Sequence, residues 1–325
     1  MPETLLLTRA DVVRLLDPHA LAAALRQAFI DYSMRRTVAA QRFAVPLPAA
    51  APAGSGGMLL APGLIDGVPA YSVKLHAKFP AEKPAIKGVL ALHDLQTGNL
   101  LALMDSAYLT AQRTALAAAL GTQTLARRDA GAVAIVGAGA QGEQTLRALA
   151  ALRPIGQVIV HDTYHAAAVA FAAALGPALG LAMRAESDLR KAVPAADIII
   201  TATWSTTPFI DAGLLRPGTH VTTLGPDQPG KAELSADAIR AGLFVCDDPD
   251  LAVSMGALGG VGLGREAIHA ELGEVLAGAR PGRTADQQVT IFGSVGLAFQ
   301  DLAAGWLVYQ RARAEGVGRT IDFLA

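Results

Sequence analysis

The chain has 325 residues, of which 52% are hydrophobic and 17% are charged. This composition excludes general disorder, and the length suggests two domains that each bury a core. Lys and Arg number 27 against 28 Asp and Glu, so the net charge of -1 provides no field that would attract nucleic acid or an anionic membrane. We therefore expect neither of these as a partner.

Cysteine usage and the apolar runs favour a reducing, cytoplasmic compartment. The lone Cys246 cannot form an internal disulfide, and the run 5–7 is too short for a signal-peptide core. The Ala-rich stretch 165–183 is interrupted by Gly176 and Pro177. We therefore expect an ordinary helix that ends near Gly176 rather than a membrane span.

The first third of the chain has an α+β pattern that predicts a sheet of its own. Thr8 and Asp11 suit a capping box at the start of a helix, and a second helix is expected over 19–35. The Pro- and Gly-rich segment 45–57 is predicted to be a connection, and 97–99 a hairpin turn. The segments expected to form strands are 58–60, 70–76, 88–94 and 100–104.

Strand and helix patterns alternate after a long helix predicted over 110–127. The apolar runs expected to be strands are 133–136, 158–160, 197–201, 220–223, 243–245 and 289–292. Such alternation indicates a parallel sheet, and a final helix over 297–314 is expected to return to the first domain. The predicted fold is therefore α/β, with a Rossmann-type doubly wound parallel sheet domain at 121–302 and an α+β domain at 1–120 and 303–325.

A glycine-rich turn, Gly137-x-Gly139-x-x-Gly142, follows a strand-like run. The first glycine permits the tight turn, the second lets the backbone approach a pyrophosphate, and the third lets the next helix pack against the strand. Ala140 and Gln141 lie between the last two glycines, where the helix N-terminus directs free N–H groups at the phosphates. The turn therefore predicts the phosphate site of a dinucleotide.

Asp162 ends the next apolar run, about twenty positions after the glycines. An acidic residue at this place accepts hydrogen bonds from a ribose 2′-hydroxyl, and its charge repels a 2′-phosphate. With strand, helix and Asp162 present, the sequence predicts a complete βαβ unit that binds NAD, with NADP disfavoured. A tight turn without a ligand is the alternative.

Seven short motifs follow one another along the chain, at 72–74, 97–98, 109–115, 136–142, 225–233, 271–278 and 292–298. In this order they resemble the ornithine cyclodeaminase/mu-crystallin family, and the resemblance covers nearly the whole length. It implies a nicotinamide enzyme that acts at the Cα–N bond of a small amino acid or imino acid. It also implies a homodimer that pairs through the N-terminal domain, which we therefore predict to bind substrate and to dimerise.

Removal of a hydride from an α-carbon requires an anchored carboxylate and a deprotonated amine. Arginine grips carboxylates bidentately, and the resemblance gives this task to Arg113 and, in Gln-Arg-Phe-Ala-Val-Pro, to Arg42. It gives Lys74 a substrate contact or a catalytic acid/base role, and it places the catalytic aspartate at Asp227, in a loop just after a predicted strand. The alternative for the three cations is that they are solvated at the surface, and the alternative for Asp227 is that it only forms a turn.

Two positions are expected near the nicotinamide. Thr203 precedes the segment 204–208, which follows a predicted strand. This segment either lines the nicotinamide or forms a plain turn. The resemblance places Ser294 near the nicotinamide as well, with a purely structural role as the alternative.

Leu59 departs from the family pattern. The cyclodeaminase proper carries a glutamate there that resembles a handle for the distal amine. We therefore expect an imine or ketimine reductase, or an amino-acid dehydrogenase that deaminates a small amino acid. Cyclodeamination of ornithine to proline and ammonia, and a non-catalytic dinucleotide- or small-ligand-binding protein, are the alternatives.

No metal site is predicted. His161 and His165 are four positions apart but straddle the end of a strand without a third ligand, and the acids within 246–250 have no completing partner. A 2-hydroxy-acid dehydrogenase is a third possibility. It requires a histidine acid, for which His76 and His93 are the only candidates.

Overall fold

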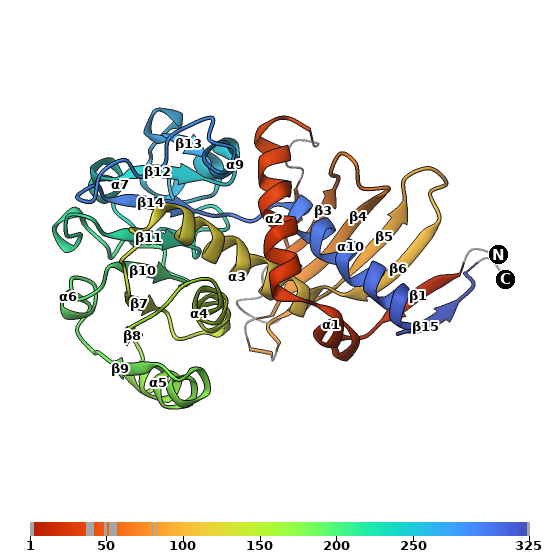
Figure 1. Ribbon diagram of the computed structural model, residues 1–325, viewed down its shortest axis with the longest axis horizontal. Coiled ribbons are helices and arrows are strands. Elements are labelled where there is room, and N and C mark those ends of the chain that lie inside the picture. The colour runs from red at the N-terminus through yellow and green to blue at the C-terminus, as the bar shows by residue number, and fades with distance from the viewer. Residues whose placement is uncertain are drawn as a thin grey trace. The chain divides into compact units, whose positions relative to one another are not determined.

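The computed structural model describes residues 3–36, 42–48, 51, 57–79, 81–82 and 84–323 (Figure 1). The chain divides into two compact units: unit 1 comprises Met1–Arg113 and Leu297–Ala325, and unit 2 comprises Thr114–Gly296. Of the connection predicted over 45–57, residues 49–50 and 52–56 lie outside the described part of the chain.

Unit 1 contains a seven-stranded mixed sheet in the order β15-β1-β6-β5-β4-β3-β2. Its strands are β1 (Thr4–Leu7), β2 (Phe43–Val45), β3 (Met58–Gly63), β4 (Ala70–Lys78), β5 (Ile86–Asp94), β6 (Leu100–Asp105) and β15 (Arg319–Ile321). β1 pairs parallel with β6, and the other neighbours are antiparallel. The four strands expected here are confirmed. β1, β2 and β15 escape prediction because each has only three or four residues.

Three helices lie on one side of this sheet: α1 (Arg9–Leu15), α2 (Pro18–Ser33) and α10 (Ala298–Glu315) (Figure 1). The capping box predicted for α1 is confirmed, since the Thr8 N–H donates to the Asp11 carboxylate (2.8 Å) and the Asp11 N–H to the Thr8 hydroxyl (3.3 Å). α10 packs against α2, β3, β4 and β5. Alternate residues of β4 are buried on the α10 side, and the others face the open side of the sheet.

Unit 2 contains an eight-stranded, all-parallel sheet in the order β13-β12-β14-β11-β10-β7-β8-β9. Its strands are β7 (Ala132–Val136), β8 (Gln157–His161), β9 (Ala182–Ala185), β10 (Ile198–Thr201), β11 (His220–Thr223), β12 (Leu243–Cys246), β13 (Ala270–Glu271) and β14 (Thr290–Gly293). The α-helices are α3 (Ser106–Leu125), which contains the boundary between the units, α4 (Ala140–Leu152), α5 (His165–Leu179), α6 (Leu189–Ala192), α7 (Ala236–Ala241), α8 (Pro249–Ser254) and α9 (Leu272–Leu276). The predicted α/β fold with a doubly wound parallel sheet is confirmed.

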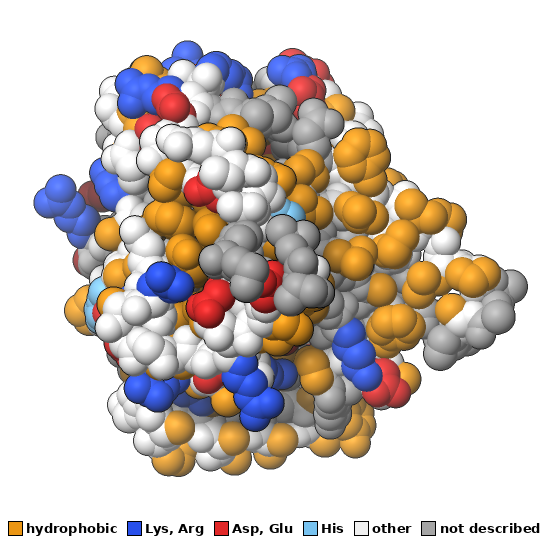
Figure 2. Space-filling model, turned by 90° about the vertical axis from the view of Figure 1, so that its right-hand side faces the viewer, with side chains coloured by type: hydrophobic (Ala, Val, Ile, Leu, Met, Phe, Trp, Pro, Cys, Tyr) orange, Lys and Arg blue, Asp and Glu red, His pale blue; other side chains and the backbone are white. Residues whose placement is uncertain are grey.

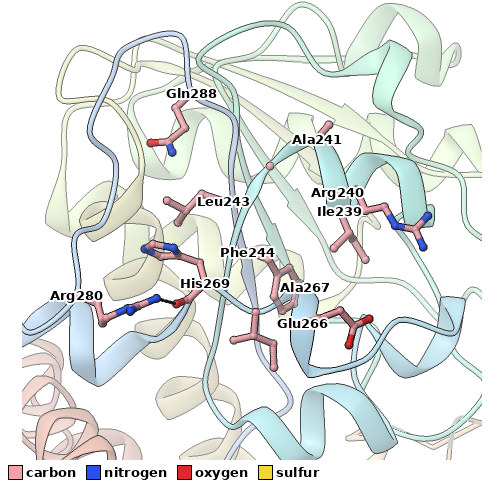
Figure 3. Close-up of a pocket in the computed structure, with 12 residues that line it drawn as sticks. Ile239, Arg240, Ala241, Leu243, Phe244, Glu266, Ala267, His269, Arg280 and Gln288 are labelled. Atoms are coloured by element: carbon pink, nitrogen blue, oxygen red, sulfur yellow. Dashed lines mark hydrogen bonds between the residues drawn. The ribbon is translucent and has the colours of Figure 1, made fainter.

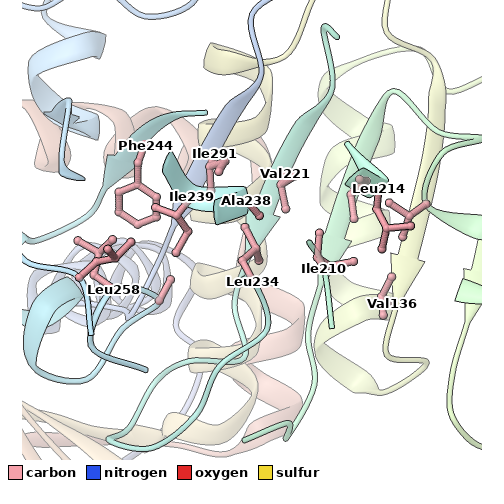
Figure 4. Close-up of a cluster of buried hydrophobic side chains, with 14 of the residues drawn as sticks. Val136, Ile210, Leu214, Val221, Leu234, Ala238, Ile239, Phe244, Leu258 and Ile291 are labelled. Carbon is pink, nitrogen blue, oxygen red and sulfur yellow. The ribbon is translucent and has the colours of Figure 1, made fainter. Parts of the chain in front are cut away.

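The central strands of unit 2 are buried on both faces, as their continuous apolar sequences indicate. Figure 4 shows one of the resulting clusters, in which Val221, Ile291 and Phe244 come from three neighbouring strands. Leu234 and Leu258, from the segments after β11 and β12, complete the same cluster. This packing holds the carboxyl ends of the strands, and the loops that leave them, at one edge of the sheet.

Helix α5 corrects the prediction that it ends near Gly176. It continues through Pro177 to Leu179, and Gly180 then adopts a left-handed conformation (φ 64°). Pro177 removes a single N–H donor close to the helix end, and the Leu181 N–H donates to the Gly176 carbonyl (3.0 Å), which closes that end. No described helix is long and apolar enough to cross a membrane.

Candidate active site

The glycine-rich turn lies between β7 and α4, at the carboxyl edge of the unit 2 sheet. Gly137 has φ 104°, a left-handed value that favours glycine, and a Cβ there would lie 2.5 Å from the Ala202 carbonyl oxygen. A Cβ at Gly142 would lie 2.5 Å from the Gly137 carbonyl oxygen, so α4 approaches the turn closely only because no side chain intervenes. A Cβ at Gly139 would meet no atom within 4 Å, which leaves open space beside the start of α4.

The N-terminus of α4 fits the phosphates of a dinucleotide. Gly139 is its N-cap and supplies no side-chain hydrogen bond, and Ala140 and Gln141 begin its first turn. The first N–H groups of a helix have no partner within the helix and carry the positive end of its dipole. An anion satisfies both, so the turn and the helix together have the geometry that a pyrophosphate requires.

Asp162 follows β8 and anchors the glycine-rich turn. One carboxylate oxygen accepts the Ala138 N–H (2.8 Å), and the other accepts the Tyr164 N–H (2.9 Å). The Gly137 N–H also donates to the His161 carbonyl (2.9 Å), so the turn is tied to the end of β8 twice. Each carboxylate oxygen has a second acceptor site, and Asp162 can therefore hold the turn and still accept a ribose hydroxyl.

A buried carboxylate, Glu233, ties together the carboxyl ends of β10 and β11. Five donors reach its two oxygens: the hydroxyls of Thr201 (2.6 Å), Thr203 (2.7 Å) and Thr223 (2.7 Å), and the N–H groups of Thr203 (2.7 Å) and Gly225 (3.0 Å). A Cβ at Gly225 would lie 2.4 Å from a Glu233 oxygen, so glycine alone leaves room for the carboxylate. Thr203, predicted near the nicotinamide, is thus fixed by an acid that the sequence pattern does not single out.

Asp227 lies in the loop after β11, and Lys231 lies beside it. The Lys231 ammonium donates to the Asp227 carboxylate (2.8 Å) and to the Gly225 carbonyl (3.2 Å). Its nitrogen also lies 4.2 Å from the centre of the Trp204 ring, a cation–π contact. Because Lys231 is buried and Asp227 is partly exposed, the lysine fixes the loop from below and Asp227 stays accessible.

Ser294 is held by Asp247, a buried carboxylate that follows β12. One Asp247 oxygen accepts hydrogen bonds from the Ser294 hydroxyl (3.0 Å) and from the N–H groups of Val295 (2.8 Å) and Gly296 (2.7 Å). Burial raises the pKa of Asp247 to about 6, against the lowering effect of these hydrogen bonds. Asp247 therefore shapes the turn in which a nicotinamide contact is predicted.

In unit 1, two of the predicted substrate-binding cations meet on one carboxylate. Asp301, on α10, accepts a hydrogen bond from Lys74 Nζ on β4 (2.5 Å) and, through its other oxygen, from Arg113 Nε on α3 (2.9 Å). Arg113 Nη1 also donates to the side-chain carbonyl of Gln300 (2.7 Å). All four side chains are buried. Lys74 and Arg113 are among the predicted site residues, whereas their partners Asp301 and Gln300 are not.

Burial and mutual attraction set the charges of this cluster of Lys74, Arg113 and Asp301. Burial lowers the pKa of Lys74 to about 8; Asp301 opposes this shift, and Arg113 adds to it. Burial by itself would raise the pKa of Asp301, but Arg113 and Lys74 hold it below its usual range. Below about pH 8 the cluster therefore carries one net positive charge. The charge of Arg42, the third predicted cation, also acts on Lys74 and lowers its pKa slightly.

Potential metal ligands are dispersed. Among the residues that the structure describes, no three or more His, Cys, Asp or Glu are grouped so that they could hold a metal ion. His161 Nδ1 lies 3.0 Å from the Glu186 carbonyl, and His165 begins α5. Cys246 is buried, and burial raises the pKa of its thiol well above the usual value.

Comparison with known proteins assigns this architecture to one family. Residues 2–316 match the model of the Ornithine cyclodeaminase/mu-crystallin family. The chain belongs to the ornithine cyclodeaminase/mu-crystallin family. The resemblance predicted from the motifs is thereby confirmed. The family comprises NAD-dependent imine reductases, amino-acid dehydrogenases and cyclodeaminases.

Three relatives in this family are similar over most of the chain. Delta(1)-pyrroline-2-carboxylate reductase from Bacillus cereus is 34% identical over 303 residues, which cover 90% of this chain and 92% of that protein. An archaeal alanine dehydrogenase dimer with bound NAD has a TM-score of 0.92 and 29% identity, covering 99% of this chain and 100% of that one. Delta(1)-pyrroline-2-carboxylate reductase from Thermococcus litoralis, in complex with NADH and L-proline, has a TM-score of 0.91 and 28% identity, covering 98% and 100%.

A groove of about 610 Å³ opens at the opposite, amino-terminal edge of the unit 2 sheet (Figure 3). It is lined by the turn 239–242, the start of β12 and residues around His269 and Arg280. The Arg280 guanidinium donates to the His269 carbonyl (2.8 Å), and His269 Nε2 lies 2.8 Å from the Pro281 carbonyl, so these polar groups engage one another. Ligands of parallel sheets bind at the carboxyl edge, so this groove lies away from the candidate active site.

The ion pairs of Asp301 predict a large effect on stability. Asp301→Asn keeps the size of the side chain but removes the charge that neutralises Lys74 and Arg113. Because two buried cations then lack a counter-charge, the free energy of unfolding in urea should fall by about 3–5 kcal/mol. The control Asp129→Asn removes an exposed carboxylate that pairs with Arg127, and it should cost less than about 1 kcal/mol. Equal losses in the two variants would contradict this account of Asp301.

Proposed function

We propose that this chain is an NAD(H)-dependent imine (ketimine) reductase or amino-acid dehydrogenase, which transfers a hydride at the Cα–N bond of a small amino acid or cyclic imino acid. One observation carries the proposal. The buried cluster of unit 1 holds two cations, Lys74 and Arg113, against one carboxylate, Asp301. One further carboxylate balances its charge, and the α-carboxylate that amino acids share with their imines supplies it.

Arg113 and Lys74 retain donors for that carboxylate. Asp301 accepts a hydrogen bond from Arg113 Nε, and Gln300 accepts one from Nη1. Among the described residues, the Nη2 donors of Arg113 therefore remain available for the substrate. The Lys74 ammonium has three protons, of which Asp301 accepts one. We assign Arg42 to the same substrate carboxylate, because its charge already acts on Lys74.

We assign Asp227 to the nitrogen of the substrate. A carboxylate at this place holds the positive charge of an ammonium or iminium group, and it takes the proton from the amine or returns it to the imine. Lys231 supports this role, since its ammonium holds the Asp227 carboxylate in position and is itself fixed by the Gly225 carbonyl and the Trp204 ring.

The glycine-rich turn of unit 2 fits NAD. The bound nicotinamide supplies or accepts the hydride at the substrate Cα. The negative charge of Asp162 beside the ribose favours NAD over NADP. The bound NAD of the archaeal alanine dehydrogenase and the bound NADH of the Thermococcus reductase support this assignment. The residues that we assign to the cofactor are Gly137, Gly139, Ala140, Gln141, Gly142, Asp162, Thr203 and Ser294.

Leu59 argues against cyclodeamination of ornithine. It is buried on β3, and that strand, Met58–Gly63, has no acidic residue that could bind a distal amine. The residue directly across from Leu59 on β4 is His76 rather than an acid. Net reduction or oxidation of a substrate without a second amine is therefore the function that these residues support best.

We also propose that the open face of the unit 1 sheet pairs with a second copy of the chain. Hydrophobic side chains gather toward the right of Figure 2. Exposed members on this face of the sheet include Phe43 and Val45 on β2 and the cross-strand pair Leu75 and Val89, which are 39% and 37% exposed. An apolar patch of this kind marks an interaction surface, and the archaeal alanine dehydrogenase is a dimer.

We place the reaction in the cytoplasm. Cys246 is the one cysteine of the sequence and is buried, so folding needs no internal disulfide and no oxidising compartment.

NADH absorbance tests the reaction directly. We expect the protein to oxidise NADH with pyrroline-2-carboxylate, with piperideine-2-carboxylate, or with pyruvate plus ammonia. Asp227→Asn should lower kcat by about 10²–10⁴-fold, because the group that moves the proton is lost, while NADH binding followed by fluorescence stays unchanged. The control Asp250→Asn removes an exposed carboxylate of unit 2 and should leave kcat unchanged.

Two results would contradict the proposed function. The first is the absence of any NADH change with all three substrates. The second is release of ammonia from ornithine without net change in NADH, which would identify a cyclodeaminase and overturn the argument from Leu59.

The pH dependence of substrate capture reports on Lys74. Its pKa is lowered to about 8, so Lys74 is charged below that pH and loses its charge as the pH rises through it. We therefore expect kcat/KM for the imine to fall about tenfold per pH unit above pH 8, as a carboxylate-binding cation is lost. In Lys74→Arg, whose guanidinium stays charged, this fall should disappear. An unchanged fall in that variant would assign the titration to a different group.

Sedimentation velocity tests the proposed dimer. Leu75→Glu places a charge in the apolar face of the unit 1 sheet, and the dimer should dissociate to monomers at micromolar concentration because burying that charge is costly. Val169, on α5 in unit 2, is similarly exposed, and Val169→Glu should stay dimeric. A wild-type monomer, or equal dissociation of both variants, would rule out this face as the interface.

A further inference from the structure

The inner face of β4 carries a row of three buried polar side chains, Ser72, Lys74 and His76, on the side that α10 covers. Alternate residues of a strand lie about 6.6 Å apart on one face. His76 therefore lies one such step beyond Lys74, on the side away from Ser72. The ion pair with Asp301 explains the burial of Lys74 but does not explain a buried imidazole at this position.

The cross-strand neighbours of His76 are Leu59 on β3 and Gly88 on β5. Directly paired residues of an antiparallel sheet point to the same face, so the apolar Leu59 stands beside the imidazole. Gly88 contributes no side chain. At this end of the row, His76 is therefore the polar group that the sheet presents beside the substrate-binding cluster.

One nitrogen of the His76 imidazole, Nδ1, is buried without a hydrogen-bond partner among the described residues. The residue is 6% exposed. Ser72 Oγ, Thr110 Oγ1 and Gln300 Nε2, on residues that adjoin or contact the cluster, are buried without partners in the same way. Buried polar atoms left unpaired destabilise a fold, so a group of them beside a charged cluster points to a ligand that completes them.

The surroundings keep His76 neutral. Burial lowers the pKa of His76 to about 3, and the charge of Lys74 contributes to the shift. Arg113 and Lys78 act in the same direction, and Asp301 opposes them. The ring therefore has one N–H donor and one acceptor nitrogen at physiological pH.

Charge balance restricts what this ring can meet. The substrate α-carboxylate already neutralises the single net charge of the buried groups Lys74, Arg113 and Asp301. Arg42, which we assign to the same carboxylate, is only partly buried, so no buried counter-charge is left for a charged side chain. Lys74 would also repel an ammonium, and a second carboxylate would face a neutral ring instead of a counter-charge. A hydroxyl group avoids both problems, and it can donate to and accept from an imidazole.

We infer that His76 determines the substrate side chain, and that it selects an imino or amino acid whose side chain carries a hydroxyl group. This inference rests on the proposed function and names the substrate class of that same site. Lys74 and Arg113 recognise the carboxylate that all candidate substrates share, whereas His76 distinguishes among their side chains.

The test compares hydroxylated and unsubstituted substrates of similar shape. The cyclic pair is pyrroline-2-carboxylate and its 4-hydroxy derivative; the open-chain pair is pyruvate and hydroxypyruvate, each with ammonia. Oxaloacetate with ammonia is the third open-chain substrate, and it tests whether the site accepts a side-chain carboxylate instead of a hydroxyl group. In the wild type, kcat/KM for the hydroxylated member should be at least about tenfold higher, because a site built to bond a hydroxyl rejects the analogue that lacks it.

Substitution of His76 should remove this preference. In His76→Leu the hydroxylated substrate should lose at least about tenfold more kcat/KM than the unsubstituted one, so that the ratio approaches one. His76→Asn keeps a donor and an acceptor and should retain part of the ratio. The control His93→Leu should leave the ratio unchanged, because His93 lies on the other face of the same sheet and stacks on Tyr71 (4.9 Å between ring centres).

Thermal melting separates this role from a structural one. His76→Leu removes an unpartnered buried atom, so its Tm should equal or exceed that of the wild type. A lower Tm with equal losses on both members of a pair would overturn the inference and assign His76 to the fold. A wild-type preference for oxaloacetate or for the unsubstituted substrates would overturn it as well.

Different results would contradict the inference on His76 and the proposed function. If the wild type reduces the unsubstituted substrates but shows no preference for the hydroxylated ones, the inference on His76 fails and the proposed function stands. If no member of either pair oxidises NADH, the proposed function fails and the inference falls with it.

Discussion

The contact of Asp301 with Lys74 and Arg113 decides how unit 1 is built. Two cations withdrawn from water need a counter-charge within hydrogen-bond distance, or the fold loses about 3–5 kcal/mol. That counter-charge lies on α10, 227 residues after Lys74 and 188 after Arg113. The last helix must therefore pack on the sheet that the first third of the chain forms. The same contact neutralises only one of the two cations, and this remaining charge is the basis of the proposed carboxylate binding.

Buried carboxylates organise unit 2 as well. Glu233 joins the ends of β10 and β11 through five donors, and Asp247 connects the end of β12 to the turn after β14. Loops at the carboxyl edge of a parallel sheet have little regular hydrogen bonding of their own, so acids with complete sets of donors take its place. Thr203 and Ser294 are consequently held in place by these carboxylates, as is Gly225, two residues before Asp227.

Features that depend on neighbours in the sequence could be predicted, and those that depend on distant partners could not. Alternating apolar runs and three spaced glycines give the parallel sheet and the turn before α4. Asp301 gives no comparable signal, because an acid in the first turn of a helix has an ordinary explanation in the helix dipole. Glu233 follows a loop, and its hydrogen-bond donors Thr201 and Thr203 lie about thirty residues earlier in the chain. No local sequence pattern therefore connects the acid with its donors. The family resemblance predicts Lys74 and Arg113 as site residues, but no pattern in the sequence indicates which residues hold them.

The division of the chain has a consequence for the order of assembly. Unit 2 is one continuous stretch, Thr114–Gly296, whereas the two pieces of unit 1 precede and follow it. During synthesis β4 has no α10 to cover it until residue 301 has left the ribosome. Until then Lys74 and Arg113 lack the carboxylate that balances their charge in the folded unit. β14, an interior strand of the parallel sheet, ends at Gly293, only eight residues before Asp301, so both units reach completion at nearly the same point of synthesis.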